Sequence, residues 1–352
     1  MSIKTNKINP LPRFTEHIVS TGLLASAPLI VVDAGSRGGF ESQWDVYKNF
    51  IRLIGFEPDI KECKRLNASV GALSGFHHHH HHYPRALHKD EGEHPFFIAQ
   101  HKPASSFYRP YSRFLDRLPE RVNRAVKEER TLETVDLDSF LDRIDMRNVD
   151  FIKLDTEGAE YDILLGAHKT LSESVFGISL EMMFNRQRIG EPLFSEIDLF
   201  LRRQGFALYD LPVFRCARTV LSPHMFSDNA GPTDHGQVAW TQAIYFRDAV
   251  DDLLFGEINQ DWDDLRVLKL ASVMELFNLE DCAIELIQTA ADKGLLSGYD
   301  RSCFVDLLVP PIQGRFLSYS EYVEHVRKEG PPRYVDGRKI SRQEDNTLKS
   351  II

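Results

Sequence analysis

FIKLDTEGAEYDILLGA (residues 151–167) is the stretch that decides the fold, because its pattern changes from a strand to a helix across a short acidic turn. Phe151–Leu154 is an apolar run that suits a covered parallel strand, and the apolar residues after the turn recur at helical spacing. Asp155 lies at the carboxyl end of the strand, where open α/β sheets place ligand chemistry. Two interpretations stay open for Glu157 and Glu160: they belong to a site, or they complement the dipole of the helix that follows.

A second strand-to-helix turn lies upstream, in LIVVDAGSRGGF (residues 29–40). A dinucleotide fingerprint would place a glycine where this chain has Asp33, and a carboxylate there would face a pyrophosphate. The spacing D-x-G-x-x-x-G, from Asp33 to Gly39, instead suits a cofactor with ammonium and sulfonium charge and no phosphate. The next apolar run, LIGFEPD (residues 53–59), ends in Glu57, about where α/β cofactor folds place an acid on ribose hydroxyls. A solvated strand-end acid is the alternative for Glu57.

Taken together with later motifs, these turns resemble the FkbM-type family of S-adenosylmethionine-dependent methyltransferases. The segments that carry the resemblance are VVDAGSRGGF (31–40), GFEPD (55–59), YPRAL (83–87), PASSFYRP (103–110), FIKLDTEGAEYDILLGA (151–167), ISLEMMF (178–184), LFLRRQGFALYDL (199–211) and HGQVAWTQAIYFR (235–247). The resemblance implies an α/β fold of the class I methyltransferase type, with a Rossmann-like sheet of seven strands, mostly parallel, and an antiparallel last strand. It also implies O-methylation of a hydroxyl on a glycan or a secondary metabolite.

The family resemblance also implies roles for individual residues of the cofactor pocket, carried over position by position. The residues expected to bind S-adenosylmethionine are Asp33, Gly35, Ser36 and Gly39 on the methionine side, Glu57 at the ribose, Ala86 near the adenine and Asp155 facing the methyl group.

Methyl transfer to an alcohol needs a base, because the hydroxyl stays protonated at neutral pH until it attacks. Asp155 is the first candidate, followed by Glu181 and by His235. Glu181 could equally be a hydrogen-bonded acid at the sheet edge, and His235 a loop histidine. In a metal-assisted version, Asp155, Glu157 and Glu181 would hold a hard divalent ion. The sequence permits such an ion without requiring it, and we assign no metal ligand.

The segment 96–134 is longer than an ordinary connection and is expected to be a long functional loop. Its aromatic and arginine side chains suit a sugar face or an acidic acceptor. We predict acceptor contacts from Ser106, Tyr108 and Arg109, together with Glu157. A surface loop of solvated charge is the alternative.

The composition of this 352-residue chain argues against two classes of partner, nucleic acids and membranes. Its formal net charge of −10 disfavours nucleic acid, which needs a concentrated basic face. No apolar run approaches the roughly 20 residues that span a bilayer. The four cysteines form no C-x-x-C pair, as expected of free thiols in a reducing compartment. We therefore expect a cytoplasmic enzyme with a small-molecule or glycan acceptor.

Three regions are expected: an N-terminal helical extension (1–28), the methyltransferase domain (29–247), and a helical C-terminal region with a polar tail (248–352). The last region could mediate homo-oligomerisation or cap the acceptor site. Strands are predicted near 29–33, 51–56, 83–87, 150–155, 177–182, 206–210 and 240–246, and helices near 41–48, 59–68, 136–143, 159–171 and 193–204. An antiparallel helical pair is predicted from Trp262 to Ala290, with a further helix near 321–328.

Six consecutive histidines, His77–His82, look like an affinity tag or natural low complexity. We expect them to fill the approach to the third strand, to form no closed metal site and to be dispensable. Two other functions are weighed against methyl transfer. One is a non-catalytic module that uses the cofactor fold to bind a glycan or protein; the other is an NAD-dependent oxidoreductase, disfavoured by the missing first glycine.

Overall fold

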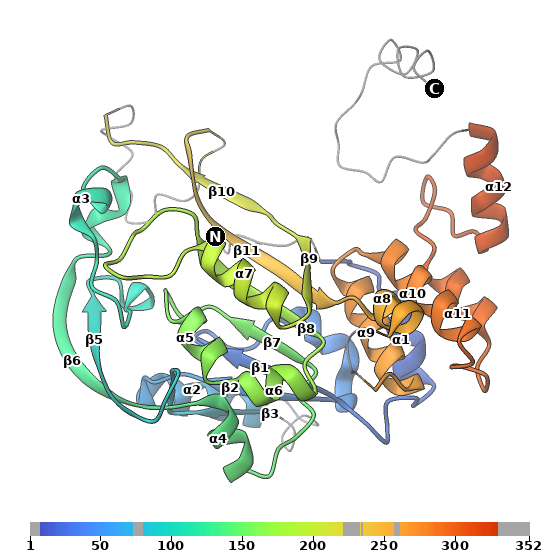
Figure 1. Ribbon diagram of the computed structural model, residues 1–352, viewed down its shortest axis with the longest axis horizontal. Coiled ribbons are helices and arrows are strands. Elements are labelled where there is room, and N and C mark those ends of the chain that lie inside the picture. Colours follow the sequence, from blue (N-terminus) through green and yellow to red (C-terminus); the bar gives the residue numbers. More distant parts are fainter. Residues whose placement is uncertain (1–7, 73–79, 221–232, 234, 257–260, 330–352) are drawn as a thin grey trace.

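The computed structural model describes residues 8–72, 80–220, 233, 235–256 and 261–329. Within them, an eight-stranded sheet forms the centre of the molecule, in the order β10-β11-β8-β7-β1-β2-β3, with β9 pairing with β11 (Figure 1). Its strands are β1 (Leu29–Ala34), β2 (Ile51–Phe56), β3 (His80–Tyr83), β7 (Phe151–Leu154), β8 (Gly177–Met183), β9 (Phe206–Asp210), β10 (Val213–Cys216) and β11 (Gln237–Arg247). Strands β3, β2, β1, β7 and β8 are parallel, and β11 is antiparallel to β8. The predicted α/β class and mostly parallel sheet are confirmed, with β10 as one strand more than predicted.

The third strand of the main sheet is not the predicted segment 83–87 but β3, which the histidine run itself supplies. The side chain of His82 is buried, and its Nδ1 lies 2.8 Å from Oγ of Ser36. The imidazole fills the space beside Gly55, where an added Cβ would lie 2.4 Å from that Nδ1. Identical residues carry no alternation of apolar and polar positions, so the strand could not be seen in the sequence pattern.

The burial of His82 gives this one position of the run a structural part, whereas the run's dispensability for turnover stays a prediction; His77–His79 lie outside the described residues. We expect His82→Ser to lower the free energy of unfolding by roughly 1–3 kcal/mol, because it removes both packing and a buried hydrogen bond. His81 is exposed on the same strand, so His81→Ser is the matched control and should cost little. Urea denaturation of the two variants and the parent measures the difference; equal stabilities would overturn the structural role of His82.

The same residue gives the protein a pH dependence with a defined sign. Burial lowers the pKa of His82 from 6.5 to about 4. Between pH 6.5 and about pH 4, the ring binds a proton in the unfolded chain but not in the folded protein. The free energy of unfolding therefore falls as the pH is lowered through this range. Stability should therefore fall less between pH 7 and pH 4.5 in His82→Ser than in the parent; equal slopes would contradict the assignment.

The segment 96–134 was expected to be a loop, and that expectation was wrong for much of its length. It belongs to a second, three-stranded sheet of order β4-β6-β5, formed by β4 (Ala86–Leu87), β5 (Gly92–Ala99) and β6 (Val126–Val135). Short helical turns η2 (Lys102–Ala104), α3 (Ser112–Leu115) and η3 (Pro119–Val122) lie between β5 and β6. Most residues of β6 are exposed, so the strand lacks the apolar alternation that would have revealed it.

The helices of the predicted methyltransferase region lie close to their expected positions. They are α2 (Ile60–Ala72), α4 (Leu137–Arg143), α5 (Glu160–Leu165), α6 (His168–Glu173) and α7 (Phe194–Arg203), with the 3-10 segment η1 (Ser42–Phe50) in place of the helix expected at 41–48. The helix expected at 159–171 is divided into α5 and α6 at Gly166. An added Cβ on Gly166 would lie 2.5 Å from the carbonyl oxygen of His88, so this position must pass close to another backbone.

The N-terminal and C-terminal helices gather beside one end of the main sheet, on the right in Figure 1. They are α1 (Arg13–Ser20), α8 (Ala249–Phe255), α9 (Asp264–Leu276), α10 (Glu280–Asp292), α11 (Arg301–Leu308) and α12 (Tyr319–Glu329), and α9 and α10 form the predicted helical pair. Their apolar residues share one core with β1, β2 and β7. The backbone N–H groups of Phe14 and Thr15 donate to Glu275, which joins the N-terminal helix to α9.

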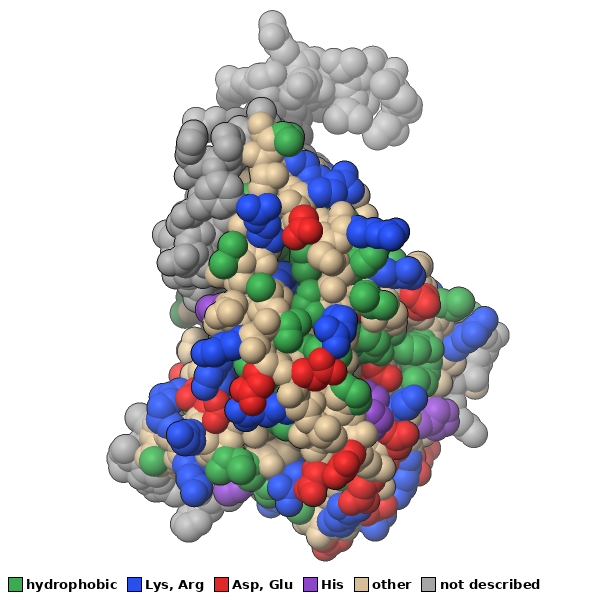
Figure 2. Space-filling view, turned by 90° about the vertical axis from the view of Figure 1, so that its left-hand side faces the viewer, with side chains coloured by type: hydrophobic (Ala, Val, Ile, Leu, Met, Phe, Trp, Pro, Cys, Tyr) green, Lys and Arg blue, Asp and Glu red, His purple; other side chains and the backbone are tan. Residues whose placement is uncertain are grey.

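Across the described part of the chain, none of the helices combines the length and the apolar character that a membrane span requires. On the end of the molecule that carries β5 and β6, acidic and basic side chains are interspersed (Figure 2).

Candidate active site

The two turns singled out in the sequence pack directly against each other. Gly35 has a φ of +81°, and an added Cβ would lie 1.9 Å from the carbonyl oxygen of Asp155. The N–H groups of Gly35 and Ser36 both donate to the carbonyl oxygen of Phe56, at 3.1 Å. These contacts fix the glycine turn between the ends of β2 and β7, and only a residue without a side chain fits there.

Lys153 is the central cation of the site, and the sequence analysis missed it. Its Nζ lies 3.0 Å from Oδ1 of Asp33 and 3.7 Å from Oδ2 of Asp155, and it donates to the carbonyl oxygen of Gly35 at 3.4 Å. Burial raises the pKa of Asp33 to about 6, a rise that the Lys153 charge limits. Burial alone would lower the pKa of Lys153, but the Asp33 and Asp155 carboxylates outweigh it and raise the pKa. The signal in the sequence was a lysine inside the apolar run FIKL.

Glu57 lies at the end of β2 as predicted, and its side chain is buried. Its Oε1 accepts a hydrogen bond from the N–H of Asp59 at 2.8 Å, and its Oε2 lies 3.6 Å from Nε of Arg37. Burial raises the pKa of Glu57, and the bond from Asp59 and the Arg37 charge oppose that rise. The carboxylate is therefore held in a fixed position beside the glycine turn.

Glu160 is a structural residue of the LDTEG turn. Its Oε1 accepts from the backbone N–H and the hydroxyl of Thr156, at 2.7 and 3.0 Å, and its Oε2 accepts from the N–H of Gly158 at 2.9 Å. Burial raises its pKa to about 7, and the backbone hydrogen bonds oppose the rise. Of the two interpretations open for this residue, the structure favours the helix-start role.

Glu157 is tied to two arginines that the sequence analysis did not single out. Its Oε2 contacts Nη2 of Arg188 and lies 3.5 Å from Nη1 of Arg124. Arg188 is buried and also pairs with Glu191, at 2.5 Å. The two guanidinium groups neutralise the Glu157 carboxylate, which leaves it little capacity to hold a metal ion.

Glu181 lies on β8, near the acids of the LDTEG turn. No hydrogen bond within the described residues reaches its buried Oε2. Burial, followed by the charges of Glu157 and Asp155, raises the pKa of Glu181 well above its usual value. The side chain of Asp155, by contrast, is 46% exposed. Asp155 and Glu181, two of the three predicted base candidates, thus lie in very different environments.

The three residues of the segment 96–134 that were predicted to contact the acceptor each bond to a different part of the protein. Ser106 is buried and donates to the carbonyl oxygen of Glu157 at 2.6 Å, so it supports the turn. Tyr108 donates to Oδ2 of Asp162 at 2.6 Å. Arg109 pairs with Glu129 on the second sheet, at 2.7 Å, and its guanidinium lies over the ring of Phe97.

The remaining predicted residues lie around the site or outside it. Ala86 is buried in β4 and pairs with Thr134 of the second sheet. Gly39, with a φ of +101°, closes the glycine turn. His235 is exposed beyond Trp240, where the pairing of β11 with β8 ends, so the structure does not place it with the acids. Its role as a base stays a prediction.

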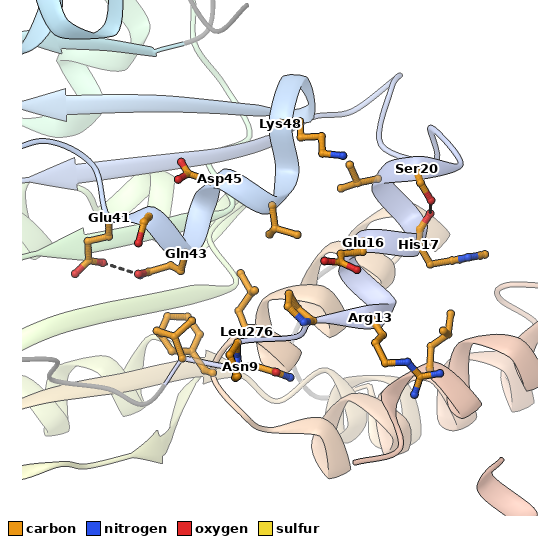
Figure 3. A pocket seen from close by; sticks show the side chains of 18 of the residues that line it. Asn9, Arg13, Glu16, His17, Ser20, Glu41, Gln43, Asp45, Lys48 and Leu276 are labelled. Atoms are coloured by element: carbon orange, nitrogen blue, oxygen red, sulfur yellow. Dashed lines mark hydrogen bonds between the residues drawn. The ribbon is translucent and has the colours of Figure 1, made fainter. Parts of the chain in front are cut away.

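A cavity of about 1160 Å³ opens beside this site, between η1, the chain leading into α1, and α9. Figure 3 shows Glu41, Gln43 and Asp45 along one side, with Asn9 and Leu276 across from them. The lining reaches the main sheet at Ser179 and Gln242, which hydrogen-bond each other at 3.0 Å. Of the lining residues, Glu41 follows Gly39 by two positions and Ser179 pairs in register with Lys153, so this end of the cavity approaches the glycine turn.

The strand order places this site at the carboxyl ends of the parallel strands, as α/β cofactor folds do. Residues 40–208 match the model of the methyltransferase FkbM domain. The matched segment, a little under half of the chain, is therefore similar to this domain. The FkbM match contains Glu57, Asp155, Glu157 and Glu181, and it begins immediately after Gly39. Two parts of the main sheet lie outside the matched residues: β1 precedes them in the chain, and β10 and β11 follow them.

Several solved methyltransferases are similar to this chain, at low sequence identity and low TM-score. The FkbM methyltransferase of Methylobacillus flagellatus KT is 16% identical, with a TM-score of 0.35; the match covers 62% of this chain and 43% of that one. Magnesium protoporphyrin IX methyltransferase (ChlM) of Synechocystis PCC 6803, with bound SAM, is 9% identical, with a TM-score of 0.32 and coverage of 67% and 79%. The N-terminal domain of EvdMO1, with SAH bound, is 8% identical, with a TM-score of 0.32 and coverage of 68% and 82%. No curated protein matches the sequence.

Proposed function

We propose that the protein is an S-adenosylmethionine-dependent O-methyltransferase that acts on a hydroxyl of a glycan or a secondary metabolite. The observation that carries the proposal is the packing of Gly35 against the backbone of Asp155, a residue whose carboxylate is itself largely exposed. The FkbM domain match supports methyl transfer. The cavity lined by Glu41, Ser179 and Gln242 is a suitable place for a hydroxylated acceptor.

The residues present fit this cofactor. Gly35 has no side chain, so the glycine turn packs directly against the backbone of Asp155 and brings the two turns together. The buried carboxylates Asp33 and Glu57 suit ammonium and hydroxyl groups, whereas they would repel a pyrophosphate. The chemistry disfavours a nicotinamide dinucleotide for the same reason.

Each residue then has a defined task. S-adenosylmethionine supplies an electrophilic methyl group when it is bound. Glu57 would bind the ribose hydroxyls, and Lys153 keeps Asp33 in place beside the turn. Asp155 would accept the proton of the acceptor hydroxyl as attack proceeds, and most of the remaining catalysis would come from positioning that oxygen. Because two arginines neutralise Glu157, the metal-assisted version has less support.

A screen of hydroxylated acceptors with S-adenosylmethionine carrying a radiolabelled methyl group tests the proposal. The expected product carries the label as a methyl ether, which resists mild base. Label in a base-labile ester or on nitrogen would overturn O-methylation of a hydroxyl. Cofactor binding without transfer to any acceptor in the panel would favour the non-catalytic binding module.

The cofactor pocket gives a prediction that needs no acceptor. Glu57→Gln should weaken the binding of S-adenosylhomocysteine about 10- to 100-fold, because a hydrogen bond to a charged group contributes roughly 1.5–3 kcal/mol. Glu133 is an exposed acid on the second sheet, so Glu133→Gln is the matched control and should bind like the parent. Isothermal titration calorimetry measures both; parental affinity in Glu57→Gln would remove this residue from the site.

A further inference from the structure

Three side chains with metal-ligating atoms meet where β4 leads into β5. His88 follows β4, Asp90 lies in the connection and His94 is on β5. Nε2 of His94 lies 2.9 Å from Oδ1 of Asp90, and Nδ1 of His88 lies 3.5 Å from the same oxygen. One ligand atom from each residue lies within 4.8 Å of the other two. This spacing, H-x-D-x-x-x-H, is separate from the histidine run and from the acidic residues that were considered as metal ligands from the sequence.

His88 is the observation that sets this group apart from an ordinary polar cluster. Its side chain is 8% exposed, and Nδ1 is buried without a hydrogen bond in the described part of the protein. Buried ring nitrogens are normally hydrogen-bonded, so an unsatisfied one aimed at two other ligand atoms indicates a missing partner.

We propose that His88, Asp90 and His94 bind a divalent transition-metal ion, with Zn²⁺ as the best match. Tetrahedral zinc with ligands at about 2.0–2.1 Å has ligand-to-ligand distances of roughly 3.3 Å, which the two observed distances bracket. Two imidazoles and one carboxylate suit Zn²⁺, whereas Mg²⁺ and Ca²⁺ prefer oxygen ligands alone. The exposed side of Asp90 leaves a fourth position for water.

The surroundings of His88 are those of a ligating histidine. Its other ring nitrogen, Nε2, faces Oδ2 of Asp162 at 3.8 Å, and that oxygen accepts the hydroxyl of Tyr108. Ligating histidines commonly have a carboxylate on this side, which orients the ring. The ion would therefore link the β4–β5 connection, through His88, to helix α5 and to the segment that carries Tyr108. Its expected role is to stabilise the second sheet against the main one.

The test uses ZnCl₂ and CoCl₂ with the full chain freed of metal. Every variant retains the histidine run, so any metal ion that the run binds contributes equally to all of them. Saturating Zn²⁺ should raise the Tm of the parent by roughly 2–5 °C, and the variants His94→Gln and Asp90→Asn should lose that rise. His101 is an exposed histidine near the end of β5, so His101→Gln is the matched control and should respond like the parent.

Co²⁺ distinguishes the site from the run, because four-coordinate cobalt absorbs visible light more strongly than the six-coordinate ion. The parent should show this absorption with one equivalent of Co²⁺, and His94→Gln should not. Zn²⁺ stoichiometry, affinity and Tm rise that are unchanged in both His94→Gln and Asp90→Asn would overturn the proposal. None of these measurements depends on methyl transfer, so a failure here is separate from a failure of the proposed function.

Discussion

Replacing Asp155 by asparagine should lower the rate of methyl transfer by roughly 10²–10⁴-fold, the range expected for loss of a general base. The substitution keeps the shape of the side chain and removes its proton acceptor. Asp155 is the exposed carboxylate at the end of β7, in contact with the glycine turn through its backbone. Cofactor affinity should change only a few-fold, because Lys153 still pairs with Asp33.

Glu181→Gln is the comparison that makes this result specific. Glu181 is the second carboxyl of the site, but its Oε2 is buried and its pKa is raised by burial and by the neighbouring acids. Single-turnover rates of both variants, on an acceptor found by the screen, separate the two candidates. Near-parental turnover in Asp155→Asn together with a large loss in Glu181→Gln would move the base to Glu181.

The second large effect concerns Lys153. We expect Lys153→Met to lower the free energy of unfolding at pH 7–8 by roughly 3–5 kcal/mol, because it leaves the Asp33 carboxylate buried without its partner. Removing the cation raises the pKa of Asp33 further. When the pKa of a carboxyl group is higher in the folded protein than in the unfolded chain, the folded protein gains stability as the pH falls through the folded-state pKa. The difference in unfolding free energy between Lys153→Met and the parent should therefore shrink toward pH 5. Urea denaturation at several pH values checks both the size and the sign.

The chain provides a matched control in a second buried pair, Lys269 with Asp150, whose atoms lie 2.8 Å apart. This pair lies at the amino ends of the strands, where Asp150 also accepts from the N–H of Ile30. Lys269→Met should therefore destabilise the protein by a similar amount and leave cofactor affinity unchanged in the folded fraction. Lys153→Met should weaken S-adenosylhomocysteine binding as well. Unchanged affinity in Lys153→Met would show that the Asp33–Lys153 pair serves stability alone.

The double variant Asp33→Asn with Lys153→Met completes the cycle. It should recover much of the stability, because no uncompensated charge stays buried. Cofactor binding should stay weak, since the carboxylate is absent. Additive losses of stability would contradict the interaction between the two residues.

The sequence determined three central strands of the main sheet and the C-terminal helical pair, but neither β3 nor the second sheet. Apolar runs that end in Asp33, Glu57 and Asp155 predicted three parallel strands whose carboxyl ends meet, because burial on both faces of a sheet requires uninterrupted apolar residues. Helical spacing of apolar residues likewise predicted the C-terminal pair α9 and α10. These features depend on neighbours along the chain, which a single sequence displays.

The partners of the charged groups were decided by the tertiary structure alone. The pairing of Lys153 with Asp33 depends on β1 and β7 being adjacent and in register. The pairing of Glu157 with Arg188 depends on the segment between β8 and α7, which brings Arg188 to the LDTEG turn. The fit of His82 beside Gly55 likewise depends on the pairing of β3 with β2. Such contacts join residues far apart in the chain, so no local period records them, and their energies depend on a burial that only the folded protein creates.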